Sequence, residues 1–184
     1  MKKLLVVVMV LALAVMLTNC GAEKPKAKMT NVPQWYLNPP QAEDAVYEAG
    51  DAVKQSMGLA KEAADARARD AIARALEVKV NNMLKNFMQE SGIGADAEAL
   101  EFTSSVSKQV SSKVLIGARV VKREIIPEGS TFHAYSLVEY RLASLVQETL
   151  DQARRQKSLY NEAKANLSFN DLEKEIEKLG KAGE

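Results

Sequence analysis

The sequence predicts an α+β domain, in which a small antiparallel sheet of about three strands is packed by a long alanine-rich helix and further helices. Three patterns indicate this fold. Apolar residues recur at helical spacing along an alanine-rich stretch. A short run that alternates small or apolar residues with polar ones precedes that stretch. Two later runs, rich in β-branched and aromatic residues, lie on either side of a Pro-Glu-Gly-Ser turn. An amphipathic helix is expected at the C-terminus.

The start of the chain has the layout of an export signal. Lys2 and Lys3 precede an uncharged apolar run from Leu4 to Leu17. Such a run fits the roughly 7–15 apolar residues of a secretory signal peptide. It is shorter than the about 20 residues that cross a bilayer. We expect residues 1–19 to be a lipoprotein signal peptide; the alternative is a short membrane anchor that stays in place.

The chain's only cysteine follows this segment. Leu17-Thr18-Asn19-Cys20-Gly21 resembles a lipobox, although Asn19 is larger than the usual Gly or Ala. A lone cysteine cannot form an intramolecular disulfide. By resemblance to bacterial lipoproteins, Cys20 becomes the acylated N-terminus and also carries a diacylglycerol, which anchors the protein to a membrane. Gly21, which is not Asp, favours the outer membrane by the same resemblance.

The rest of the chain divides into a lipidated tether at residues 20–31, one α+β domain at 32–165 and a C-terminal helical tail at 166–184. After removal of the signal, 23 Lys and Arg residues stand against 24 Asp and Glu, a formal balance of −1. A near-neutral body gives no electrostatic basis for binding nucleic acid.

The domain is expected to begin with a proline-framed arm from Val32 to Pro40, which holds the only Trp. Proline fixes φ and disfavours helix in the residue before it, so the arm should be extended and stiff. Trp35 either anchors the arm on the core or, with Tyr36, forms an exposed aromatic patch that contacts a partner.

A first strand or a strand-to-helix turn is expected within Ala45–Ala52, ending near Gly50, followed by the long helix, which Ser91-Gly92 ends. Its apolar stripe includes Ala60, Ala64, Ala68, Ala71, Ile72, Ala75, Leu76, Val80, Met83, Leu84, Phe87 and Met88. Asp65 stands four residues before Arg69, and Asp70 four before Arg74. These pairs favour a solvated charged face over a nucleic-acid patch.

Asp96 should cap a second helix, with Leu100, Thr103, Val106, Val110 and Val114 on one side. Residues 117–126 and 131–142 should then form an antiparallel hairpin. Its alternation slips at Leu137-Val138, which indicates a bulge or burial on both faces.

A further helix is expected from Ala143, and a tail helix that Asn170 caps with Glu173 three residues on. This last helix carries a narrow apolar stripe of Leu172, Ile176 and Leu179. It is too short to be stable alone. We expect it to pack on the body of the domain, to pair with a second copy or to fray.

The inventory of reactive side chains is small. His133 is the only histidine, and the sequence places no catalytic or metal-binding partner beside it, so a structural or exposed role is favoured. We expect no enzyme activity, no metal and no cofactor beyond the lipid on Cys20. Met57, Met83, Met88 and Phe87 are candidates to line a small-molecule site between helix and sheet, although core packing is the favoured interpretation.

Three features resemble the twenty-kilodalton bacterial lipoprotein antigen family, the LPP-twenty family. They are the Pro33-x-Trp35-Tyr36 arm ending in Pro39-Pro40, the Tyr47–Gly50 entry to the alanine-rich helix, and the hairpin segment Ala134–Tyr140. The resemblance implies a membrane-associated lipoprotein without catalytic residues. Relatives include a flagellar outer-membrane lipoprotein, and the flagellar assembly protein T has a similar N-terminal domain.

Two functions follow as expectations. The first is a structural, assembly or protein-interaction role in the cell envelope, through self-association or a flagellar-type assembly, with contact candidates Trp35, Tyr36, Leu172, Ile176 and Leu179. The second is a periplasmic lipoprotein that binds or senses a small molecule.

Overall fold

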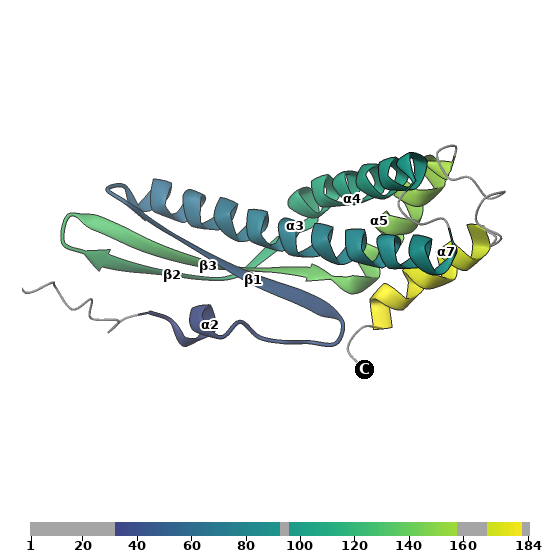
Figure 1. Cartoon of the computed structure of the whole chain (residues 1–184). Coiled ribbons are helices and arrows are strands. Elements are labelled where there is room, and N and C mark those ends of the chain that lie inside the picture. Colours follow the sequence, from purple (N-terminus) through teal and green to yellow (C-terminus); the bar gives the residue numbers. More distant parts are fainter. Residues whose placement is uncertain (1–31, 93–95, 158–168, 182–184) are drawn as a thin grey trace, which may run out of the picture. The chain divides into compact units, whose positions relative to one another are not determined.

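The computed structural model describes residues 32–92, 96–157 and 169–181. Cys20, the expected signal peptide and the tether lie outside the described residues. A short helix α2 precedes the first strand, and helices precede and follow the hairpin of the other two strands (Figure 1). The elements are α2 (Gln34–Leu37), β1 (Ala45–Lys54), α3 (Met57–Glu90), α4 (Ala97–Gly117), β2 (Arg119–Glu128), β3 (Thr131–Arg141), α5 (Leu142–Arg155), α7 (Phe169–Glu177) and the 3₁₀ turn η2 (Lys178–Lys181).

The three strands form one antiparallel sheet in the order β1-β3-β2, which confirms the predicted fold class. β3 is therefore the central strand, although it is the last in sequence. Two neighbouring rows cross the middle of the sheet. Gly50 lies opposite Ser136, which lies opposite Arg123 on the other side. In the next row Asp51, Tyr135 and Glu124 are aligned. Successive residues of a strand point to opposite faces, so these rows serve different faces.

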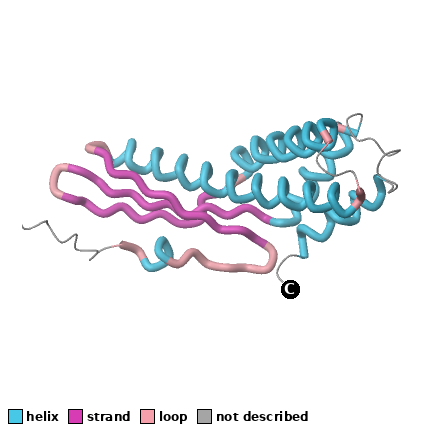
Figure 2. Tube along the Cα trace, viewed as in Figure 1, coloured by secondary structure: helices cyan, strands magenta, loops and turns pink. Residues whose placement is uncertain are grey.

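The first row faces α3, which runs along one face of the sheet (Figures 1 and 2). Helix and strand are very close at Gly50. A Cβ on this glycine would lie 2.4 Å from the backbone nitrogen of Ala68 and 2.9 Å from the carbonyl oxygen of Ala64. Only a residue without a side chain fits there. Alanines on the helix and glycine on the strand thus set the spacing of the two layers.

Side chains between the layers form two buried clusters. The smaller one lies where β1 passes into α3, and its fully buried members are all alanines: Ala52, Ala60, Ala64 and Ala134. The larger cluster holds the bulky side chains of the other half of α3 together with α4, α5 and α7. The change from small to large residues along α3, visible in the sequence, therefore separates an end packed by alanines from an end packed by bulky side chains.

Caps and breakers lie where the sequence predicts them around α4. The Asp96 side chain accepts hydrogen bonds from the backbone N–H groups of Glu98 and Ala99, at 3.0 and 3.1 Å. Gly92, just after α3, has a φ of 78°, which glycine adopts without strain. The prediction that Leu100 lies on the apolar side of α4 is wrong. Leu100 is 45% exposed, whereas Phe102 of the same helix is fully buried.

Two further expectations are corrected, and one is confirmed. The arm is not extended throughout: one helical turn, α2, follows Pro33, whose φ of −60° is suited to a helix start. The irregularity predicted at Leu137-Val138 is confirmed: both residues are buried, and the register of β2 shifts opposite them, with Val121 as the extra residue between Val120 and Lys122. α7 begins at Phe169, so Asn170 lies inside its first turn.

Candidate functional site

The second row of the sheet, on the face opposite α3, receives the N-terminal arm. Tyr36 of α2 donates a hydrogen bond to Asp51 Oδ1 at 2.8 Å, and its ring packs edge-on against Tyr135 with centroids 4.9 Å apart. Trp35 donates from Nε1 to Glu124 at 3.4 Å. The Lys122 ammonium lies 5.4 Å from the centre of the Trp35 ring, in cation–π geometry. We call this surface the arm-binding face.

At its centre a polar cluster joins the arm to all three strands, through Asp51 of β1, Glu128 of β2, and His133 and Tyr135 of β3. His133 Nε2 lies 2.8 Å from Asp51 Oδ2, so one carboxylate contacts both the arm tyrosine and the histidine. The other ring nitrogen, Nδ1, lies 3.1 Å from the Tyr135 hydroxyl and 3.2 Å from Glu128 Oε1. The backbone carbonyl of Asp51 also accepts a 2.7 Å hydrogen bond from Arg67 on α3.

The pKa shifts in this cluster follow from these contacts. Partial burial raises the pKa of Tyr36, its hydrogen bond to Asp51 adds to the effect, and together they bring it to about 12. Burial also acts to raise the pKa of Asp51. The hydrogen bonds from His133 and Tyr36 outweigh it and lower that pKa below its usual range. The carboxylate therefore stays ionised and the phenol stays protonated at neutral pH, as the docked arm requires.

The hydrogen bonds of His133 follow from its contact with the ionised Asp51. This carboxylate accepts the proton on Nε2. Nδ1 then accepts the hydroxyl hydrogen of Tyr135. The ring thus joins the carboxylate that holds the arm to the central strand.

On the opposite face, a buried carboxylate joins α3 to the hairpin. Asp65 is 7% exposed. Its carboxylate accepts two hydrogen bonds from Arg123, of 2.8 and 2.7 Å, and a third from Ser136. Burial acts to raise the pKa of Asp65, but these bonds outweigh it and lower the pKa. The sequence interpretation of an exposed Asp65–Arg69 pair is thus corrected, because Asp65 faces the sheet and Arg69 donates to the carbonyl of Ala118.

The comparison with known families matches this part of the molecule. The sequence model of the LPP20 lipoprotein family covers residues 33–139, which include the arm, α3, α4 and nearly all of the sheet. The chain belongs to the LPP20 lipoprotein family. Membership identifies a membrane-associated lipoprotein of the envelope, as the resemblance implied. No curated protein and no solved structure matches the chain.

Trp35 and Tyr36, which open the LPP20 region, are both half-buried on their own sheet. Trp35 contacts Glu124 and Lys122 of β2 and belongs to neither core cluster, so it does not anchor the arm on the core as predicted, and part of its surface stays accessible. The neighbouring Leu37 is 44% exposed. The arm therefore combines an internal contact with an apolar edge that faces solvent.

The other predicted contact residues lie beyond the LPP20 region and are not at the surface. Leu172 and Ile176 are fully buried and Leu179 is 5% exposed, all within the larger core cluster. The expectation that they contact a partner is corrected, since their stripe packs on the body of the domain. Arg154 of α5 holds the outer side of α7 through Glu173 at 2.7 Å. Lipidation of Cys20 falls outside the described residues.

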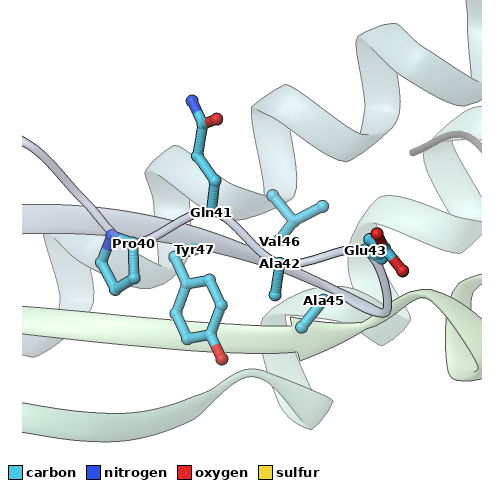
Figure 3. A pocket seen from close by; sticks show the side chains of 7 residues that line it. All are labelled: Pro40, Gln41, Ala42, Glu43, Ala45, Val46 and Tyr47. Atoms are coloured by element: carbon cyan, nitrogen blue, oxygen red, sulfur yellow. The ribbon is translucent and has the colours of Figure 1, made fainter. Parts of the chain in front are cut away.

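The predicted lining of a small-molecule site is not assembled. Met88 and Phe87 are buried in the larger cluster and Met83 packs against it, whereas Met57 is 55% exposed at the opposite end of α3. A hollow of about 440 Å³ lies elsewhere, between the linker that follows the arm and the first residues of β1 (Figure 3). It is lined by Pro40, Gln41, Ala42, Glu43, Ala45, Val46 and Tyr47.

Two LPP20-region residues at the centre of the arm-binding face, Asp51 and Glu128, gave no signal in the sequence analysis. Asp51 stands 82 positions before His133 and Glu128 belongs to the predicted turn. The register of β1 against β3, had it been known, would have placed Asp51 beside His133.

Within the described ranges no helix is long and apolar enough to cross a membrane. No group of three potential metal ligands occurs among those same residues.

Proposed function

We propose that the chain is exported, lipidated on Cys20 and held at the outer membrane, where it acts as a non-enzymatic accessory protein that contacts other envelope proteins. One observation carries the proposal. The match to a lipoprotein family begins at Pro33, directly after the expected tether, and includes the arm that joins the tether to the sheet. Gly21 supports the choice of the outer membrane by resemblance alone.

The arm-binding face supports a mechanical role over a catalytic one. Asp51 is held by both Tyr36 and His133, and the pKa of Tyr36 lies far above neutrality at about 12. A tyrosine used as a base or nucleophile needs the opposite shift. We therefore assign the cluster to holding the arm, so that force or orientation from the lipid anchor passes into the sheet.

For the partner contact we favour the apolar edge of the arm, around Trp35 and the exposed Leu37. Aromatic side chains that are partly exposed beside apolar ones are typical of protein interfaces. A second copy of the chain or a component of a flagellar-type assembly would both fit this proposal. The covalent lipid is the only non-protein group that it requires.

Two experiments test these statements separately. A Cys20→Ser variant should remain unprocessed and should no longer fractionate with membranes. Unchanged processing and fractionation would contradict the proposed lipid anchor. In intact cells, a photoreactive residue in place of Leu37 should give crosslinked species above the monomer. The same residue in place of Val78, which is 58% exposed on α3, serves as the control. Recovery of monomer alone from both positions would contradict the interaction role.

A further inference from the structure

Three larger apolar side chains are exposed at the end of the domain where β1 passes into α3. The interior of this end holds alanines, none more than 1% exposed, and the partly buried Ile125 and Phe132 pack against them. Outside this cluster, Val53 is 45% exposed, Met57 55% and Leu59 59%. We call these three residues the apolar tip.

Single exposed apolar residues are ordinary on protein surfaces, but a group of them marks a contact. Val53 lies in β1 two residues after Asp51, so its side chain is on the arm-binding face, whereas Met57 and Leu59 follow at the start of α3. The three residues therefore lie at one end of the domain, on both sides of the sheet. The larger core cluster, by contrast, buries Leu76, Leu84 and Phe102 almost completely.

The arm leads the chain to the same end. Tyr36 contacts Asp51, whereas Pro40, further along, lines a hollow with Tyr47. The arm therefore runs antiparallel to β1, and the segment that leads into α2 lies toward the end of the sheet where β1 passes into α3 (Figures 1 and 2). This is the end at which the tether joins the domain.

We propose that the apolar tip inserts into the headgroup region of the bilayer to which the protein is anchored, an inference that rests on the proposed lipidation of Cys20. Residues 20–31 span at most about 40 Å when fully extended, at 3.3–3.6 Å per residue. The membrane is therefore always within reach, at a high effective concentration. Lys54 and Lys61, both exposed, flank the tip and suit anionic headgroups, with Glu62 beside them.

The test places a polarity-sensitive fluorophore at the tip of the full lipidated protein. Cys20 is the only cysteine and its thiol is taken by the lipid, so an introduced cysteine is labelled alone. Leu59→Cys and Val78→Cys form a matched pair, because both residues lie on α3 and are 59% and 58% exposed. They are separated by about 28 Å along the helix at 1.5 Å per residue. The proteins are reconstituted in vesicles of phosphatidylethanolamine and phosphatidylglycerol.

Insertion predicts a blue-shifted emission at position 59, quenched several-fold more strongly by lipid-attached spin labels than the emission at position 78. Equal quenching at both positions in protein that floats with the vesicles would overturn the tip contact and leave the anchor intact. A blue shift that grows with the protein-to-lipid ratio, without quenching by lipid, would assign the tip to a second copy and also overturn it. Failure to float would refute the anchor and the tip contact together.

Discussion

The spacing between α3 and the sheet makes Gly50→Ala the most informative single change in the fold. The added methyl would lie 2.4 Å from the Ala68 nitrogen and 2.9 Å from both the Ala68 Cα and the Ala64 oxygen. Ordinary carbon contacts are about 3.5–4.0 Å. All three atoms belong to the helix backbone, so no side-chain rotation relieves the clash, and the helix must move away by roughly 1 Å.

The magnitude follows from what this movement costs. Overpacking a close-packed interior costs about 1–3 kcal/mol, and a radial gap of about 1 Å forfeits up to half of each dispersion contact. Alanine also restricts the unfolded chain, which returns about 0.4–1 kcal/mol. The net expectation for Gly50→Ala is a loss of about 1–2 kcal/mol. For a chain of this size each kcal/mol shifts Tm by about 2–4 °C, so Tm should fall by roughly 2–8 °C.

Gly58→Ala is the matched control, measured by thermal and urea denaturation followed by circular dichroism. Gly58 also lies at the alanine-packed end, in the first turn of α3, but its added Cβ would meet only Ser56 Oγ at 3.8 Å. Alanine is preferred over glycine in helices by up to about 1 kcal/mol, so this variant should be unchanged or slightly more stable. A Gly50→Ala protein that melts within 1–2 °C (roughly 0.5 kcal/mol) of the parent would refute the close-approach argument.

Three other predictions concern the polar contacts and the tail. Asp65→Asn should lower the free energy of unfolding by about 1–2 kcal/mol at neutral pH. The loss stays this small because Arg123 is partly exposed. Because the folded-state pKa of Asp65 is lowered, its contribution is lost as pH falls below about 4, so parent and variant should converge in acid; a constant gap in urea titrations would argue against it. Tyr36→Phe should speed amide hydrogen exchange at Tyr36, Leu37 and Asn38, whose N–H groups donate within the turn, through a loss of about 0.5–1.5 kcal/mol of protection, with Tm nearly unchanged; unaltered exchange would mean that the Asp51 bond does not hold the arm. Leu172→Ala should lose about 2–5 kcal/mol and expose α7 to protease, whereas an unaffected protein would indicate a frayed tail.

Local patterns in the sequence predicted most of the elements. Asp96 and Gly92 marked the two helix boundaries around the α3–α4 turn because capping depends only on neighbouring residues. The hairpin followed from two apolar runs separated by a short turn. The first strand was expected to end near Gly50 and continues to Lys54, since pairing with β3 extends it.

The functional surfaces were harder to predict because they depend on which distant elements meet. Asp65 has the spacing of a helix salt bridge with Arg69, and its true partner, Arg123, is 58 residues away. Leu172 and Ile176 were recognised as one apolar stripe, but periodicity does not say whether a stripe meets its own domain or another molecule. Asp51 and His133 became neighbours only through the register of β1 on β3.

The strand order also determines when the sheet can form. β1 and β2 do not pair with each other; both pair only with β3, which spans Thr131–Arg141. Because a chain is synthesised from its N-terminus, β1 and β2 are complete before the central strand has been made. Until that segment arrives, only the local helices α3 and α4 can begin to form, and pairing across such long sequence separations is slow. The late central strand thus delays completion of the sheet until most of the chain has been made.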